Sequence, residues 1–87
     1  MSTPDAKKIG ARFREIRQSL GVPMREMAEK LGYTQYQTVA SIEAGRQNLT
    51  LGILNQVAEM GFDITWLVTG KGSMTSKGAS QVKELIQ

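Results

Sequence analysis

Two short segments that each contain a helix-ending glycine constrain the fold of this chain more than any other feature. The first runs from Met27 to Gly32, and the second, Glu43-Ala44-Gly45-Arg46, begins eleven residues after Gly32. Glycine often ends a helix because it reaches left-handed backbone conformations without strain. The spacing therefore predicts two short helices that cross at the small residue Ala28, with a polar run from Thr34 to Thr38 opening the second. A helix presented in this way has about the right width for the DNA major groove.

The composition excludes several classes of protein. A chain of 87 residues makes one domain with a modest core. It has no cysteine and no histidine, so disulfides, thiolate metal sites and the commonest general base are absent. No apolar run resembles a signal peptide or approaches the roughly 18 residues of a membrane span. We therefore expect a cytoplasmic protein without a membrane segment, a metal or a cofactor.

The positive charge is concentrated in the first half of the chain. Residues 1–48 carry a net charge of +3, and residues 49–87 carry none. A basic half is typical of a nucleic-acid-binding surface, although a solvated helix surface would have the same composition.

Apolar periodicity predicts an all-α fold with five helices and no strand. The first helix is expected to start with Thr3 as its cap and Pro4 at its first position, and to end at Gly21. The second runs from Pro23 to Leu31, and the third runs from a Thr34 cap to about Ala44. Thr50 and Asp63 are expected to cap the fourth and fifth helices, which end at Gly61 and Gly70. The fifth helix carries Trp66 and Leu67. The side chains expected in the core are Ile9, Phe13, Ile16, Leu20, Met27, Ala28, Leu31, Val39, Ile42, Leu51, Leu54, Val57 and Ala58.

Trp66 allows two interpretations. It either closes the bottom of the core or stands exposed as an anchor between two subunits. If it is part of the core, Ile64 or Val68 is left to line a surface that pairs the subunits.

The order and spacing of these segments resemble the Xre/Cro-type helix-turn-helix family of bacterial and phage repressors. The likeness covers roughly residues 9–70. It is carried by Ile9-Gly10, Phe13, Ile16-Arg17, Gly21, Met27 to Gly32, Val39, Ile42-Glu43, Gly45-Arg46, Leu54, Ala58, Asp63, Trp66-Leu67 and Gly70. The resemblance implies a five-helix Cro/repressor-like domain over residues 1–70. Residues 71–87 are then a linker and a short apolar tail with Val82, Leu85 and Ile86, a possible dimerisation segment.

The resemblance also implies structural roles for four residues. Ala28 matches the small residue where the second helix packs on the third. Gly32 matches the turn position that favours positive φ. Arg17 and Glu43 match an ion pair that ties the first helix to the third.

Three departures from the family pattern stand out. The apolar anchor of the third helix is expected ten residues after Ala28, which is Thr38, but Val39 is the apolar residue. One residue is therefore inserted before Val39, so the turn or the start of the helix must differ. Pro23 and Met24 stand where the family often has a Ser or Thr cap and a Gln, and Asn48-Leu49 stands where it often has Asn-Pro.

Alignment backward from Glu43 places five polar side chains on the exposed part of the third helix. We expect these to contact bases, because glutamine pairs with adenine and Thr or Tyr contacts thymine methyls. They are Gln35, Tyr36, Gln37, Thr38 and Ser41. The alternative is a solvated polar turn, with Tyr36 folded onto the domain. Phosphates are expected to bind cations, hydroxyls and amides around the helix, namely Thr34, Arg46, Gln47, Asn48, Thr50, Arg12 and Arg25.

The leading functional hypothesis is a phage or prophage-type repressor that binds double-stranded DNA as a homodimer on an inverted repeat. The alternative is an antitoxin that captures a toxin, a protein partner, through residues 71–87 and autoregulates its operon. An enzyme is disfavoured, because catalysis would depend on exposed carboxylates such as Glu26 and Glu29.

Overall fold

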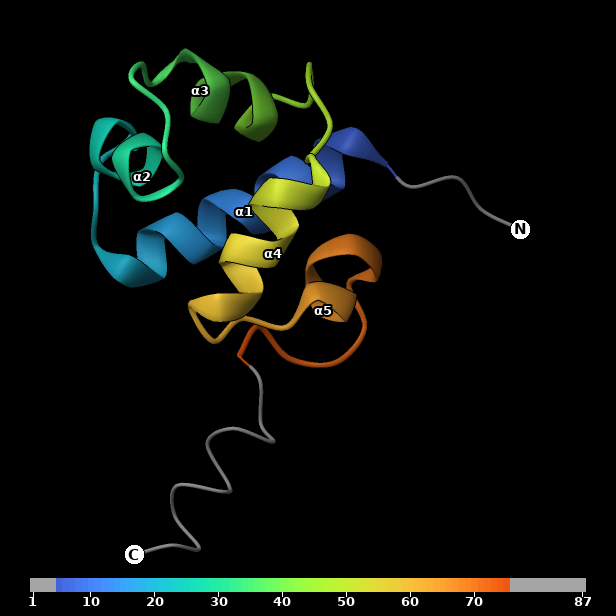
Figure 1. Ribbon diagram of the computed structural model, residues 1–87. Coiled ribbons are helices and arrows are strands. Elements are labelled where there is room, and N and C mark those ends of the chain that lie inside the picture. The colour runs from blue at the N-terminus through green and yellow to red at the C-terminus, as the bar shows by residue number, and fades with distance from the viewer. Residues whose placement is uncertain (1–4, 76–87) are drawn as a thin grey trace, which may run out of the picture.

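The computed structural model describes residues 5–75, and this part of the chain forms five helices, whose arrangement can be followed in Figure 1. Their bounds are α1 Ala6–Leu20, α2 Met24–Lys30, α3 Gln37–Glu43, α4 Leu51–Glu59 and α5 Ile64–Thr69. Figure 1 places α3 and α5 on opposite sides of the molecule with α1 between them, and α1 packs against both. The predicted all-α fold is confirmed.

The core lies around the middle of α1, where Phe13 and Ile16 are fully buried. Every other helix contributes to it, so the core depends on all five. The buried apolar side chains are Ile9, Phe13, Ile16, Met27, Ala28, Leu31, Val39, Ile42, Ile53, Val57, Phe62 and Leu67. This confirms the predicted inner faces of α2 and α3.

Three residues predicted to lie in the core are exposed instead. Leu51 is 85% exposed and Leu20 is 37% exposed, and Ala58 also faces solvent. In α4 the buried stripe runs through Ile53 and Val57, four residues apart. Leu51 is two residues from Ile53, about 200° around the helix, so it cannot share that face. Leu20 is the last residue of α1, where the chain turns at Gly21.

Two predicted helix starts are wrong. Asp5 caps α1, and its Oδ1 accepts from the backbone N–H of Lys7 at 2.9 Å and of Lys8 at 3.3 Å. The predicted cap, Thr3, and Pro4 lie outside the described residues. Helix α3 begins two residues later than a Thr34 cap would require, and Tyr36 occupies its N-cap position without a side-chain hydrogen bond.

Most other predicted helix ends are confirmed. The Thr50 hydroxyl accepts from the N–H of Ile53 at 3.1 Å, and the Asp63 carboxylate accepts from the N–H groups of Thr65 and Trp66. Gly21 and Gly70 end α1 and α5 with positive φ. Helix α2 begins at Met24, one residue later than predicted, and Pro23 is its N-cap and not its first residue.

The described part of the predicted linker lies against the domain. The Asp63 N–H donates to the carbonyl oxygen of Met74 at 2.9 Å, and Phe62 forms a single antiparallel bridge with Thr75. Met74 is half-buried against the core. The apolar tail residues Val82, Leu85 and Ile86 lie outside the described residues.

Candidate nucleic-acid interface

The turn between α2 and α3 is built by two backbone hydrogen bonds around Gly32. The N–H of Gly32 donates to Glu29 at 3.1 Å, and the N–H of Tyr33 donates to Ala28 at 2.9 Å. This pattern ends a helix with a left-handed residue, and Gly32 has φ +86°. The predicted role of Gly32 is therefore confirmed, and Ala28 is buried as expected.

Val39 is the apolar anchor of α3. It is fully buried in the core, whereas Thr38 is only half-buried. The predicted anchor at Val39 is confirmed. Because α3 begins at Gln37, both Gln35 and Tyr36 precede the helix and belong to the turn.

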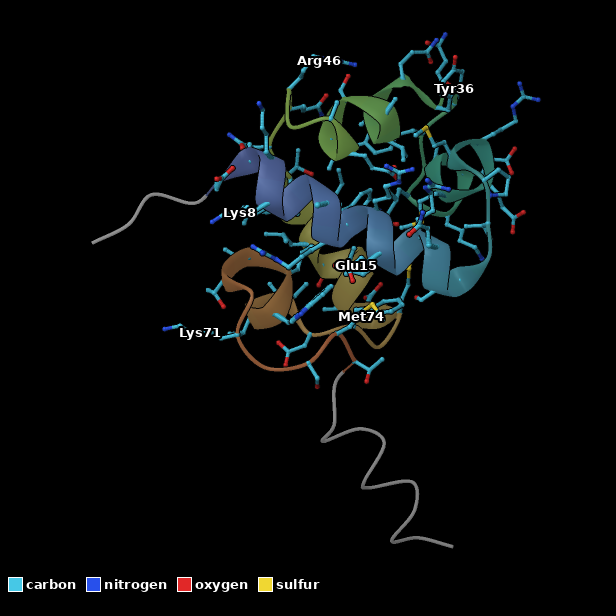
Figure 2. The ribbon with its side chains drawn as sticks, turned by 180° about the vertical axis from the view of Figure 1, so that it is seen from behind. Lys8, Glu15, Tyr36, Arg46, Lys71 and Met74 are labelled. Atoms are coloured by element: carbon cyan, nitrogen blue, oxygen red, sulfur yellow. The ribbon has the colours of Figure 1, made fainter. Side chains whose placement is uncertain are left out.

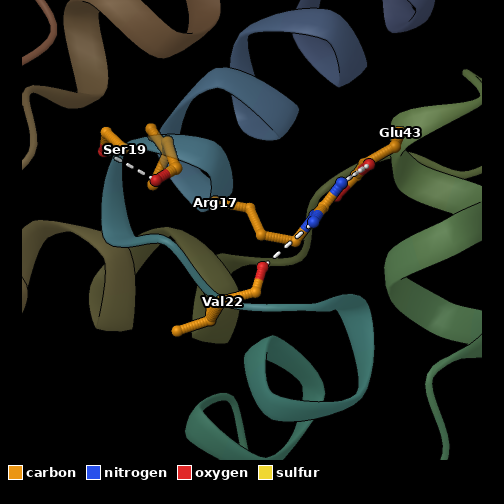
Figure 3. Close-up of polar contacts among 5 residues, drawn as sticks. Arg17, Ser19, Val22 and Glu43 are labelled. Atoms are coloured by element: carbon orange, nitrogen blue, oxygen red, sulfur yellow. Dashed lines mark hydrogen bonds and ion pairs between the residues drawn. The ribbon is translucent and has the colours of Figure 1, made fainter.

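Arg17 and Glu43 join α1 to the last residue of α3, as predicted. Arg17 Nε donates to Glu43 Oε2 at 2.6 Å, and Nη2 donates to Oε1 at 3.2 Å (Figure 3). The third guanidinium nitrogen, Nη1, donates to the carbonyl oxygen of Val22 at 3.0 Å, so Arg17 also holds the connection into α2. The hydrogen bond to Glu43 raises the pKa of Arg17, and burial opposes that shift.

The close approach of α1 to α3 depends on Gly10. A Cβ atom at this position would overlap the carbonyl oxygen of Ile42 and lie 2.9 Å from that of Glu43. The sequence analysis placed Gly10 in the family pattern without identifying this reason. Helix packing of this kind lets α1 and the Arg17–Glu43 pair determine where α3 lies.

A side chain of α4 supports the turn from the other side. Gln56 Nε2 donates to the carbonyl oxygen of Leu31, the residue that ends α2, at 3.1 Å. The sequence analysis missed this contact, because no local pattern joins residues that are 25 positions apart.

Polar side chains gather along the turn before α3, along α3 itself and along the following loop, and we call this set the polar edge. Gln35, Tyr36 and Gln37 are exposed, and Thr38 and Ser41 are half-buried. Tyr36 is 46% exposed and projects away from the body of the domain in Figure 2. The polar edge comprises Thr34, Gln35, Tyr36, Gln37, Thr38, Ser41, Arg46, Gln47 and Asn48.

The loop after α3 carries the predicted phosphate-binding side chains. Helix α3 is terminated by Gly45, which has φ +80°. The N–H of Gly45 donates to the carbonyl oxygen of Ile42 at 3.1 Å, and the N–H of Arg46 donates to the carbonyl oxygen of Ser41 at 2.9 Å. Arg46, Gln47 and Asn48 are all exposed. Figure 2 shows Arg46 and Tyr36 at opposite ends of α3. Thr50 follows at the start of α4, where it is exposed while capping that helix.

Arg12 and Arg25 differ in their surroundings. Arg12 Nε donates to the carbonyl oxygen of Leu67 at 2.7 Å and Nη2 to that of Val68 at 3.0 Å. Its guanidinium therefore binds the end of α5, which lies on the opposite side of α1 from α3. For this reason Arg12 is not part of the candidate interface. Arg25 is exposed on α2 and stays a candidate.

The side of the domain formed by α5 is partly apolar. Leu67 is fully buried, whereas Trp66, Ile64 and Val68 are half-buried and pack against the core. Trp66 therefore contributes to the core without being enclosed by it.

Two other kinds of site are absent from the part of the chain that the structure describes. Within residues 5–75, no helix combines the length and hydropathy needed to cross a bilayer. The same residues hold no group of three acidic, histidine or cysteine side chains placed to bind a metal ion.

The chain matches a known protein family. Residues 13–61 match the helix-turn-helix family, and this segment is more than half of the 87-residue chain. It includes the second half of α1 and all of α2, α3 and α4. The comparison with curated proteins found no match. The chain therefore belongs to the Xre/Cro-type helix-turn-helix family, whose domains bind DNA sequence-specifically and regulate transcription.

Proposed function

We propose that this protein is a transcriptional repressor of the phage or prophage type. In this proposal it binds an inverted-repeat operator as a homodimer, and α3 of each subunit enters the major groove. The polar edge is the observation that carries the proposal. It presents exposed Tyr36 and Gln37 at the start of α3, which is tied to α1 by the Arg17–Glu43 pair, so base-reading groups project from a rigid support.

The chemistry of the polar edge suits base readout. The amide of Gln37 or Gln35 can pair with N6 and N7 of adenine, and each good bidentate pair contributes about 1–3 kcal/mol of discrimination. Residues Gln37 and Ser41 are four positions apart and so share one outer face of α3. Tyr36 and Thr38 offer apolar surface to thymine methyls.

The neighbouring residues suit phosphate binding. Arg46, Gln47 and Asn48 follow α3 directly and are exposed, and Thr34 lies at the other end of the polar edge. Thr50 and Arg25 lie at the starts of α4 and α2. Such groups position a protein on the duplex without reading its sequence.

The short length of α3 is the reason that we expect a dimer. Helix α3 has seven residues and is therefore about 10 Å long, enough for only a few base pairs. Two-fold pairing would place two such helices about 34 Å apart on successive turns of the duplex. The half-buried Ile64 and Val68 of α5 and the tail residues 82–86 are the surfaces that we assign to this pairing.

The test is selection of preferred sites from random duplex DNA, followed by mobility-shift titration with competitor DNA. We expect an inverted repeat to be selected. Gln37→Ala should lose about tenfold or more in affinity for it while keeping its non-specific affinity. Gln18→Ala is the matched control, because this exposed glutamine of α1 lies outside the polar edge, whereas Lys71 lies on the side of α5 that we assign to pairing (Figure 2).

A selection that yields no preferred sequence would contradict the repressor proposal. The antitoxin hypothesis, with capture of a protein partner through residues 71–87, would then become the leading explanation. Sedimentation of the complex tests the dimer separately, since one chain per operator would contradict it.

A further inference from the structure

We propose that Lys7, in the first turn of α1, is a further phosphate-contacting residue, which extends the DNA interface from α3 across to α1. The inference rests on the proposed DNA-binding function. Neither the sequence pattern nor the family match assigns Lys7 a role, and residue 7 lies before the matched segment.

The position of Lys7 is determined by Gly45. A Cβ atom built on Gly45 would lie 2.7 Å from Lys7 Cγ and 2.9 Å from Lys7 Cα, closer than packed atoms allow. The absence of a side chain at Gly45 therefore lets the loop that carries Arg46 lie directly on the first turn of α1. Gly10, three residues after Lys7 and so on the same side of α1, likewise lies close to the backbone at the end of α3. Lys7 thus faces the end of α3 and the beginning of the polar-edge loop.

The side chain of Lys7 is available for a ligand. Its stem lies along Gly45, while the residue as a whole is exposed. Within residues 5–75 the structure gives its ammonium no hydrogen bond or ion pair. Arg46, next to Gly45, is also exposed and makes no side-chain hydrogen bond to the described residues. Two unpaired cations from different elements therefore border the same edge, as an interface that follows a phosphate backbone requires.

Asp5 supplies a charge of the opposite sign beside Lys7. Its carboxylate accepts from the backbone N–H groups of Lys7 and Lys8, so it lies at the same end of α1. An anion there repels a phosphate. Asp5→Asn keeps a side-chain oxygen for the cap and removes the charge, which provides a variant with the opposite expected effect.

Lys8 provides a matched control. It is the next residue, it carries the same charge, and it is exposed. Figure 2 shows Lys8 on the side of α1 that faces away from Arg46. A change in net charge alone would affect the two lysines equally, whereas a specific contact would affect only Lys7.

The competing explanation is that Lys7 stabilises the negative end of the α3 dipole. Cations near a helix C-terminus do so, and Lys7 lies beside the loop at that end. This role would lower the melting temperature of Lys7→Ala and leave the affinity and salt dependence of the folded protein unchanged.

The experiment is a titration of the selected operator duplex by fluorescence anisotropy at several salt concentrations, with melting curves for every variant. We expect Lys7→Ala to weaken binding by roughly five- to tenfold per subunit at about 0.1 M salt, and to reduce the log–log salt slope by about 0.9 per subunit. Lys7→Arg should restore both, Lys8→Ala should match wild type, and Asp5→Asn should bind more tightly.

Two results would overturn the inference. One is an unchanged salt slope for Lys7→Ala, and the other is an equal loss for Lys7→Ala and Lys8→Ala. These results differ from a failure of the proposed function, in which the wild-type protein itself selects no operator.

Discussion

Arg17 and Glu43 form two hydrogen bonds, of 2.6 and 3.2 Å, between the last turn of α1 and the last residue of α3. Their side chains are only 13% and 4% exposed, so the charges interact with little screening. Through this pair the longest helix of the described chain determines the orientation of the helix that presents the polar edge.

Glu43→Gln is expected to destabilise the fold by about 2–4 kcal/mol, because it leaves the Arg17 charge poorly solvated and without a counter-charge. The double variant Arg17→Met/Glu43→Leu should cost less than the sum of Arg17→Met and Glu43→Leu, since it removes both charges. Urea unfolding of wild type, these two single variants and the double variant measures the coupling. Additive losses would contradict the assigned ion pair.

Gly10→Ala is expected to destabilise the protein by about 2–4 kcal/mol, because the new methyl group would overlap the carbonyl oxygen of Ile42. Gly52→Ala is the control, since this residue of α4 has only the Thr50 hydroxyl within reach, at 3.8 Å. There the substitution should stabilise by about 0.5–1 kcal/mol through helix propensity. Thermal melts that shift in the same direction for both variants would contradict the close approach of α1 to α3.

Arg12→Met is expected to lower the free energy of unfolding by about 1–3 kcal/mol, because the carbonyl groups of Leu67 and Val68 lose charged donors. The salt slope of DNA binding, measured by anisotropy on the folded variant, should equal that of wild type. A slope reduced by about 0.9 per subunit would instead return Arg12 to the phosphate-binding residues.

Leu51→Gln is expected to change the free energy of unfolding by less than about 0.5 kcal/mol, because this side chain is 85% exposed. Ile53→Ala, two positions further along α4, should cost about 2–4 kcal/mol, because Ile53 is 1% exposed. Chemical denaturation of the two variants compares them directly. Equal losses would show that Leu51 is covered in solution, as it would be if it lay between two subunits.

Local patterns predicted several helix ends correctly. Gly21, Thr50, Asp63 and Gly70 end or cap their helices because left-handed glycine and short polar side chains satisfy free backbone groups within a few residues. The two wrong starts, at Thr3 and Thr34, have different origins. At α1 a second capping residue, Asp5, stands two positions after Thr3 and accepts the free N–H groups. At α3 the helix begins after Tyr36, which makes no side-chain cap, so the capping preference of Thr34 does not determine where the helix starts.

The sequence by itself determined the helical fold, the buried positions of α2 and α3, the shift of the anchor to Val39, and the pairing of Arg17 with Glu43. The spacing of apolar residues and the resemblance to the family predict these features. Only the tertiary structure decided that Ile53 rather than Leu51 is buried, that Arg12 binds α5, and that Lys7 lies against Gly45. The reason is physical, because each of these outcomes depends on how helices distant in sequence approach one another, and no local pattern specifies the rotation or separation of two packed helices.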